Sequence, residues 1–236
     1  MRNRITTGLA LLCLVALLAQ SAFAEPALSY GDGNCGKLQG GKALPCTGPN
    51  FTAYSRVACT MGRNYLHPLV QKTVVDAFTA VEQKDPRRVW QYGEMGKAEG
   101  GSLWPHKTHQ NGRAADFFMP VVNAQGEPAA VPISAFNKFG YGLEFDKRGR
   151  LGDLQIDWRA IGDYLLALES AGRAHQVRIK RIIITPSFHQ QLLQRAPAIR
   201  HLSSLLMPTE AWVRHDEHFH VDFDIPAELK RPLRCR

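Results

Sequence analysis

Beyond its N-terminus, the chain lacks any hydrophobic run long enough to cross a membrane. A spanning helix needs about 20 consecutive apolar residues, and the apolar run from Leu9 to Leu18 is shorter than that. Arg2 and Arg4 precede this run, and an Ala-Phe-Ala tripeptide ends it at Ala24. This order is typical of a secretory signal peptide. We therefore expect cleavage after Ala24 and a periplasmic or secreted protein with no stable membrane insertion.

Cysteine is scarce, and no C-x-x-C pair is present, which argues against a structural zinc site built from cysteines. Cys13 falls within the expected signal peptide and lacks the small residues that precede a lipid-modified cysteine. The other four form an even set in an exported chain, which favours two disulfides. Three pairings are open: Cys46 with Cys59 would close a short loop, and Cys35 with Cys235 would tie the two ends of the domain together.

Two further absences exclude common partners. The basic residues form no cluster, although the net charge is +8, so we expect no nucleic acid partner. The charge instead favours anionic polymers in general. The glycine-rich stretch YGEMGKAEGG lacks the G-x-x-x-x-G-K-[ST] spacing, so it is not a phosphate-binding loop. Its glycines instead indicate a loop that approaches another part of the chain closely.

Hydrophobic spacing predicts an α+β domain. Apolar residues recur at helical spacing from Pro68 to Glu82 and from Trp158 to Gly172, where the glycine is expected to end the second helix. Strands are predicted at Arg88–Tyr92, Arg113–Met119, Gln176–Thr185 and His218–Asp224. We expect a small antiparallel-rich sheet with helices packed on one side.

The remaining segments carry weaker signals of secondary structure. Residues 25–67 have no sustained periodicity, which predicts an irregular segment pinned by disulfides, and residues 120–132 are predicted to form a loop. Residues 68–236 then form one domain. The run from Gln176 to Thr185 ends in continuous apolar residues, which favours a central strand, and Ser187 is expected to cap a short helix after it.

Histidine is concentrated in two segments, PHKTHQNGRAAD (Pro105 to Asp116) and HDEHFHVDF (His215 to Phe223), which hold five of the nine. Because successive strand residues point to opposite faces, His218 and His220 share one face of the last strand. Asp116 lies on a strand and His109 in the loop before it. Gly112 between them lets the backbone turn back, so two imidazoles and a carboxylate can meet.

These side chains are the usual ligands of a catalytic zinc ion, which keeps its fourth position for water. The ion lowers the pKa of that water to about 7 and polarises a carbonyl group. Hydrolysis of an amide bond is therefore the predicted reaction. The second histidine on the same strand face is placed to transfer a proton or stabilise the oxyanion.

The same residues resemble a known superfamily. His109, Gly112, Ala114 and Asp116 fit H-x-x-G-x-A-x-D, and His218-Phe219-His220 fits H-x-H, of the lysostaphin, D-Ala-D-Ala carboxypeptidase and hedgehog zinc peptidases. The stretches GEMGKAEGG, TPSFHQQLL and WVRHDEHFHV resemble more closely the penicillin-insensitive murein endopeptidases. This likeness extends from about residue 54 to residue 226.

The resemblance implies a role for each histidine of the two segments. His109, Asp116 and His220 would bind zinc, and His218 would be the catalytic histidine. His215 would be a second active-site histidine near the leaving group or oxyanion. His106 would contribute to a second metal position or to the substrate groove.

The implied substrate is the peptide part of peptidoglycan (murein), cleaved between D-Ala and meso-diaminopimelate. Two alternatives stay open: a D,D- or L,D-carboxypeptidase of the same fold, and a non-catalytic module that binds wall fragments. Among the aromatic residues, Trp158 is expected in the core, whereas Trp104 and Trp212 are expected to wall the groove. Asp222 and Asp224 are candidates to orient a ligand imidazole.

Overall fold

The computed structural model describes residues 25–104 and 106–235, so the expected signal peptide lies outside the described residues. A five-stranded sheet, in the order β12-β13-β7-β6-β4, forms the centre of the domain. Its strands are β4 (Phe51–Ala53), β6 (Trp90–Tyr92), β7 (Ala114–Phe118), β12 (Arg178–Ile183) and β13 (His218–Asp224). All neighbours are antiparallel except β4 and β6. The predicted antiparallel-rich α+β fold is confirmed.

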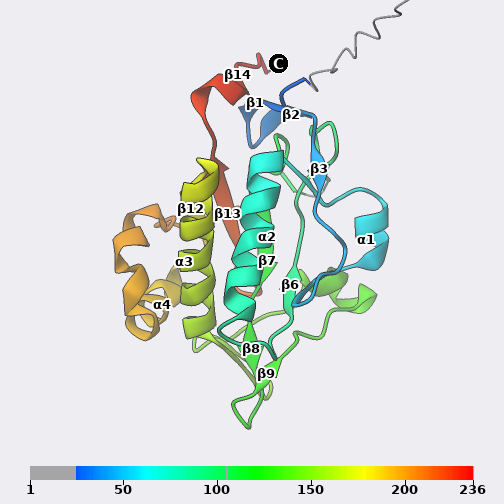
Figure 1. Ribbon diagram of the computed structural model, residues 1–236. Helices are drawn as coiled ribbons and strands as arrows, with labels where there is room; N and C mark the ends of the chain where they lie inside the picture. Colours follow the sequence, from blue (N-terminus) through cyan, green and yellow to red (C-terminus); the bar gives the residue numbers. More distant parts are fainter. Residues whose placement is uncertain (1–24, 105, 236) are drawn as a thin grey trace, which may run out of the picture.

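Two long helices, α2 (Pro68–Glu82) and α3 (Trp158–His175), lie side by side across one face of the sheet (Figure 1). Tyr164 of α3 stacks on Phe78 of α2, with ring centroids 5.0 Å apart. The Tyr164 ring also meets the edges of Phe117 on β7 and Phe219 on β13, at 4.9 and 6.4 Å. This face of the two strands is therefore core, and Asp116, one residue from Phe117, belongs to the opposite face.

The helix starts expected at Pro68 and Trp158 are confirmed. Pro68 opens α2, and the ring of His67 accepts a hydrogen bond from the backbone N–H of Leu69 at 3.3 Å. Asp157 caps α3 by accepting from the N–H of Ala160 at 3.1 Å. These caps fix where each helix begins on the sheet.

The predicted end of α3 is wrong. The helix continues past Gly172 to His175 and ends at Gln176, whose φ of 58° is left-handed. Gly172 is needed for packing instead, because a Cβ there would lie 2.5 Å from the carbonyl oxygen of Val177. Ser187 is likewise not a cap: it lies inside the short helix Pro186–Phe188, which follows Thr185.

The strand β12 is an edge strand and not a central one. Only its last residues, Ile182 and Ile183, are buried, whereas Lys180 and Arg181 are exposed. Its apolar half is buried because the chain after it folds back, and Leu206 forms an isolated bridge with Ile182. The apolar run at the end of β12 is therefore buried by the later segment around Leu206, and not by a neighbouring strand on that side of the sheet.

The N-terminal segment is more regular than the sequence predicts. It contains β1 (Leu28–Asp32), β2 (Cys35–Gln39), β3 (Lys42–Ala43), β4, α1 (Arg56–Thr60) and β5 (Tyr65–Leu66). The hairpin of β1 and β2 pairs with β14 (Lys230–Arg231) near the C-terminus. Disulfides join Cys35 to Cys235 and Cys46 to Cys59. The structure therefore contains one of the three pairings that the four cysteines allow.

The remaining elements are short. The expected loop at 120–132 contains β8 (Val121–Val122) and β9 (Pro128–Ala129), which form a small sheet with β10 (Arg150–Leu151) and β11 (Leu154–Ile156). The helical turns are η1 (Ala135–Gly140), η2 (Pro186–Phe188), α4 (His189–Arg195), η3 (Pro197–Leu205) and η4 (Ala227–Leu229). Among the described residues, no helix combines the length and apolarity that a membrane span requires.

Candidate metal centre and active site

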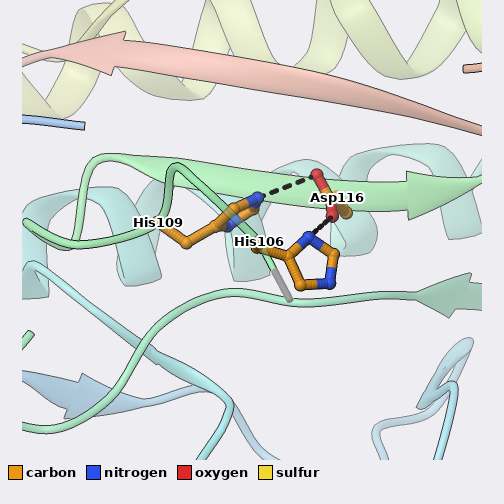
Figure 2. A group of neighbouring side chains, drawn as sticks. All are labelled: His106, His109 and Asp116. Carbon is orange, nitrogen blue, oxygen red and sulfur yellow. Dashed lines mark ion pairs between the residues drawn. The ribbon is translucent and has the colours of Figure 1, made fainter. Parts of the chain in front are cut away.

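Three predicted site residues form a compact group on the face of the sheet opposite the helices. The ligand atoms of His106, His109 and Asp116 all lie within 4.8 Å of one another. His109 Nε2 is 3.2 Å from one oxygen of Asp116, and His106 Nδ1 is 3.9 Å from the other. Figure 2 shows both rings reaching the carboxylate of β7 from the preceding loop. Such a group of two imidazoles and a carboxylate can hold a metal ion.

His220 joins this group from the neighbouring strand. It lies directly opposite Asp116 in the β7–β13 ladder, and its Nδ1 is 2.9 Å from Asp116 Oδ1. The rings of His109 and His220 are 4.8 Å apart and nearly perpendicular. The structure therefore brings together the two distant histidine segments, and three of the predicted ligands meet at one carboxylate oxygen.

The loop geometry that places His109 is unusual. His109 has a φ of 68°, a left-handed conformation that non-glycine residues rarely adopt, and Gly112 has a φ of 72°. A Cβ on Gly112 would lie 2.7 Å from the backbone nitrogen of His67. The backbone therefore turns sharply before β7, and this turn delivers the imidazole to Asp116.

Hydrogen bonds on the outer side of each ring fix which nitrogen faces Asp116. His109 Nδ1 lies 2.8 Å from the carbonyl oxygen of Met95 and donates to it, which leaves Nε2 directed inward. His220 Nε2 donates to Asp222 Oδ1 at 3.0 Å, which leaves Nδ1 directed inward. Metal-binding histidines are usually oriented by such acceptors. The donor set therefore fits a metal ion.

Asp222 thus contacts the imidazole of His220 as expected, and the expectation for Asp224 is wrong. Asp222 is held in place by Arg181, whose guanidinium lies 2.6 Å from Oδ2. Asp224 instead forms ion pairs with Arg178 at 2.9 Å and Lys230 at 2.6 Å. The two aspartates differ because the sequence after β13 returns Lys230 to Asp224.

The charges of the metal-free centre are strongly coupled. Burial opposes the charge on His220, but Asp222 and Asp116 outweigh it and raise its pKa to about 10. Burial also opposes the charge on Asp116, yet His109 and His218 hold the pKa of that carboxyl well below its usual range. The metal-free centre therefore favours a protonated His220 beside an ionised Asp116.

His218 and His215 lie beside this group, and their pKa values shift in opposite directions. His218 Nδ1 bonds to Glu217 Oε1 at 2.9 Å, and its Nε2 is 3.8 Å from Asp116 Oδ2. Burial lowers its pKa, but Asp116 and Glu217 more than compensate and raise it. The ring of His215 is 4.5 Å away, and burial together with the charge of His218 lowers its pKa to about 3. The surroundings therefore favour the charged form of His218 and the neutral form of His215.

Comparison with known proteins agrees with this geometry. A model of the penicillin-insensitive murein endopeptidase family matches residues 29–232. The chain belongs to that family. A search of curated proteins found no match. Membership confirms the predicted family and makes the protein a peptidase whose implied substrate is peptidoglycan.

The candidate site also includes two residues that the sequence analysis did not predict, Tyr141 and Glu94. The hydroxyl of Tyr141 donates to Asp116 Oδ2 at 3.0 Å and accepts from the N–H of Glu94 at 2.8 Å. Its ring contacts those of His106 and His218, with centroids 5.1 and 5.0 Å away. Burial and the charge of Asp116 raise the pKa of Tyr141, which keeps the hydroxyl a donor.

Glu94 supports this arrangement from the glycine-rich stretch. It pairs with Arg63 at 2.8 Å and bonds to the hydroxyl of Tyr54. The close approach expected for this stretch is seen at Gly93, where a Cβ would lie 2.4 Å from the Tyr141 hydroxyl. The glycines were the one sequence signal for this part of the murein endopeptidase site, whereas Tyr141 carried none.

The three tryptophans for which a position was predicted differ in their exposure. Trp158 is 6% exposed and belongs to the core, which confirms its assignment. Trp104 is 84% exposed and Trp212 is 44% exposed. Trp212 lies with its ring 6.1 Å from that of His215 and borders a surface hollow. Walls of a substrate groove therefore stay a prediction for these two residues.

Proposed function

We propose that this protein is an exported zinc peptidase that hydrolyses amide bonds in the peptide cross-links of peptidoglycan, between D-Ala and meso-diaminopimelate. The observation that carries the proposal is the convergence of His109 Nε2 and His220 Nδ1 on Asp116, beside His218. Family membership supports the substrate class. The two disulfides, together with the family, support a periplasmic location.

His109, Asp116 and His220 would hold the zinc ion. His106 approaches the second oxygen of Asp116 and is the candidate for an additional ligand. When bound, zinc supplies a water of pKa about 7 and a Lewis acid that polarises the amide carbonyl. Tyr141 keeps the Asp116 carboxylate oriented by donating to Oδ2.

His218 is the residue that we assign to proton transfer. Its Nδ1 is fixed by Glu217, so Nε2 faces the centre. Burial opposes the charged form of the ring, but Asp116 and Glu217 outweigh it and raise the pKa of His218, which favours a proton on Nε2. That N–H can donate a hydrogen bond to the oxyanion and afterwards transfer its proton to the departing amine nitrogen as the C–N bond breaks. An ordinary histidine, without Glu217 and Asp116 beside it, would lose this proton near pH 6.5.

His215 has a different part in the proposed reaction. Its Nδ1 donates to the carbonyl oxygen of Val213 at 2.9 Å, so the neutral ring offers Nε2 only as an acceptor. It can therefore accept a hydrogen bond from water or from a substrate N–H. The oxyanion role implied for it by resemblance fits His218 better.

The test is digestion of purified cross-linked muropeptide dimers by the zinc-loaded protein, with and without a chelator. Conversion of dimers to monomers that stops with chelator supports the endopeptidase. Release of free D-alanine without loss of cross-links would replace it with a carboxypeptidase. Binding without any cleavage would leave only the wall-binding module.

A further inference from the structure

The loop that carries His109 is held by the hairpin of β1 and β2, which lies far from it in the sequence. The Oγ of Ser29 on β1 donates to the carbonyl oxygen of Asn111 at 2.9 Å. The Nδ2 of Asn111 donates to the carbonyl oxygen of Gly31 at 3.3 Å. Ser29 is 0% exposed and Asn111 is 2% exposed, so water does not compete for these bonds. The hairpin thus fixes both the backbone and the side chain of a residue two positions from His109.

Gln110, the residue directly after His109, is held on two sides. Its N–H donates to the carbonyl oxygen of Gly33, in the turn of the hairpin, at 3.1 Å, and its carbonyl oxygen accepts from the N–H of Gly101 at 2.8 Å. Its side-chain Oε1 accepts from the N–H of Gly36 on β2 at 3.4 Å. The peptide groups before and after Gln110 are therefore both bonded to other segments, which restricts the backbone next to His109.

These bonds act on a strained backbone. The left-handed φ of 68° at His109 is costly for a residue that has a side chain. Such a conformation persists only where the surrounding structure enforces it. The hairpin can enforce it because it is itself fixed: β1 pairs with β14, and the N–H of Leu38 on β2 donates to the carbonyl oxygen of Glu99 at 2.9 Å.

We propose that the hairpin of β1 and β2 is part of the metal-binding machinery, and that Ser29 and Asn111 are positioning residues which keep His109 directed at Asp116. The inference rests on the proposed function, because it takes the ion to be bound at Asp116. If the loop leaves this position, His109 cannot bind the ion, so the apparent zinc affinity falls with the fraction of molecules whose loop is in place. A bond that only stabilised the fold would lower the melting temperature without changing this fraction.

The test removes one hydroxyl that contacts the loop and one that does not. Ser29→Ala loses the bond to Asn111, whereas Tyr30→Phe, the matched control in the same hairpin, loses a bond to Gln39 on β2. Competition with a chromophoric chelator measures the zinc affinity of both variants. We expect Ser29→Ala to bind zinc about tenfold more weakly, the size expected when a buried acceptor loses its donor. Tyr30→Phe should bind zinc as the wild type does.

Amide hydrogen exchange of residues 106–113 reports on the loop in the metal-free protein. Exchange there should be faster in Ser29→Ala than in Tyr30→Phe, because the loop opens more often without its bond to the hairpin. Equal zinc affinity in the two variants, or equal exchange of this segment, would overturn the inference.

A second variant serves where Ser29→Ala does not fold. Gln110→Ala removes a half-buried side chain that bonds only to Gly36 and Lys107, and the same comparison with Tyr30→Phe is then made. Zinc binding also separates this inference from the proposed function. If the wild type binds zinc but cleaves no dimer, the proposed peptidase fails and the affinity difference still decides the inference. A wild type that binds no zinc would overturn both.

Discussion

His220 faces Asp116 directly across the β7–β13 ladder, with Nδ1 2.9 Å from Oδ1. The two residues are 104 positions apart in the sequence, so strand register alone brings them together. A one-residue slip of β13 would turn Phe219 toward Asp116 and His220 into the core. The aromatic packing of Phe219 under α3 therefore protects the register on which the centre depends.

Metal binding should release a proton. In the metal-free protein the pKa of His220 is about 10, above its ordinary 6.5, so the ring is protonated at neutral pH. A metal ion at Nδ1 must displace that proton, and the affinity should rise with pH until about pH 10. Calorimetric titration with zinc in two buffers of different ionisation enthalpy measures the release. Equal heats in both buffers would contradict a bond to His220.

Substitution should separate a ligand from a proton donor. We expect His220→Ala to lose both bound zinc and activity. His218→Ala should keep stoichiometric zinc and lose about 10²- to 10⁴-fold in kcat, the usual contribution of acid–base catalysis. Metal analysis of both purified variants, beside dimer digestion, checks the difference. Loss of zinc from His218→Ala would show that the two roles are assigned to the wrong residues.

Asp222→Asn should weaken zinc binding about 10- to 100-fold, because Asp222 orients the His220 ring. Asp224→Asn is the control, since Asp224 lies two residues further on the same strand but pairs with Arg178 and Lys230. It should bind zinc as the wild type does. Competition with a chromophoric chelator measures both affinities. A similar loss in the two variants would mean that the general charge of β13, and not orientation, is responsible.

Glu217→Gln should move the pH profile of kcat to lower pH. Glu217 supports the charged form of His218, so removing its charge lowers the His218 pKa, and the proton donor is lost at a lower pH. The basic limb therefore shifts, while the amide keeps the ring in place. Glu144→Gln, at an exposed acidic residue that pairs with Arg214, is the control. An unshifted basic limb would exclude His218 as the donor.

Local sequence patterns were sufficient to predict the main helix and strand boundaries around the site. The start and end of α2 and the limits of β13 agree with the sequence, because helix spacing, a starting proline and strict alternation are local signals. Sheet order is not local, and so β12 was expected at the centre and is found at the edge. Gly172 was expected to end α3 because backbone contact with Val177 has no local signal.

The difference between local and non-local signals also explains which residues of the candidate metal centre were predicted. The meeting of the two histidine segments was predicted because each lies on or next to a predicted strand. Pairing of those two strands is enough to bring the histidines together. Tyr141 was missed because it follows a turn in which Lys138 and Phe139 have left-handed φ values of 54° and 55°. No periodicity describes such a segment, and its contact with Asp116 arises only when the chain folds back over the sheet.

The disulfide of Cys35 and Cys235 has a consequence for when the site is completed. Cys35 directly follows Gly33 and Asn34, which border the surface hollow beside Trp212, and its partner lies 200 residues further along the chain. That border is fastened only after those 200 residues have been synthesised and the two thiols oxidised. A chain in a reducing compartment therefore lacks this covalent tie between its N-terminal hairpin and its C-terminal end.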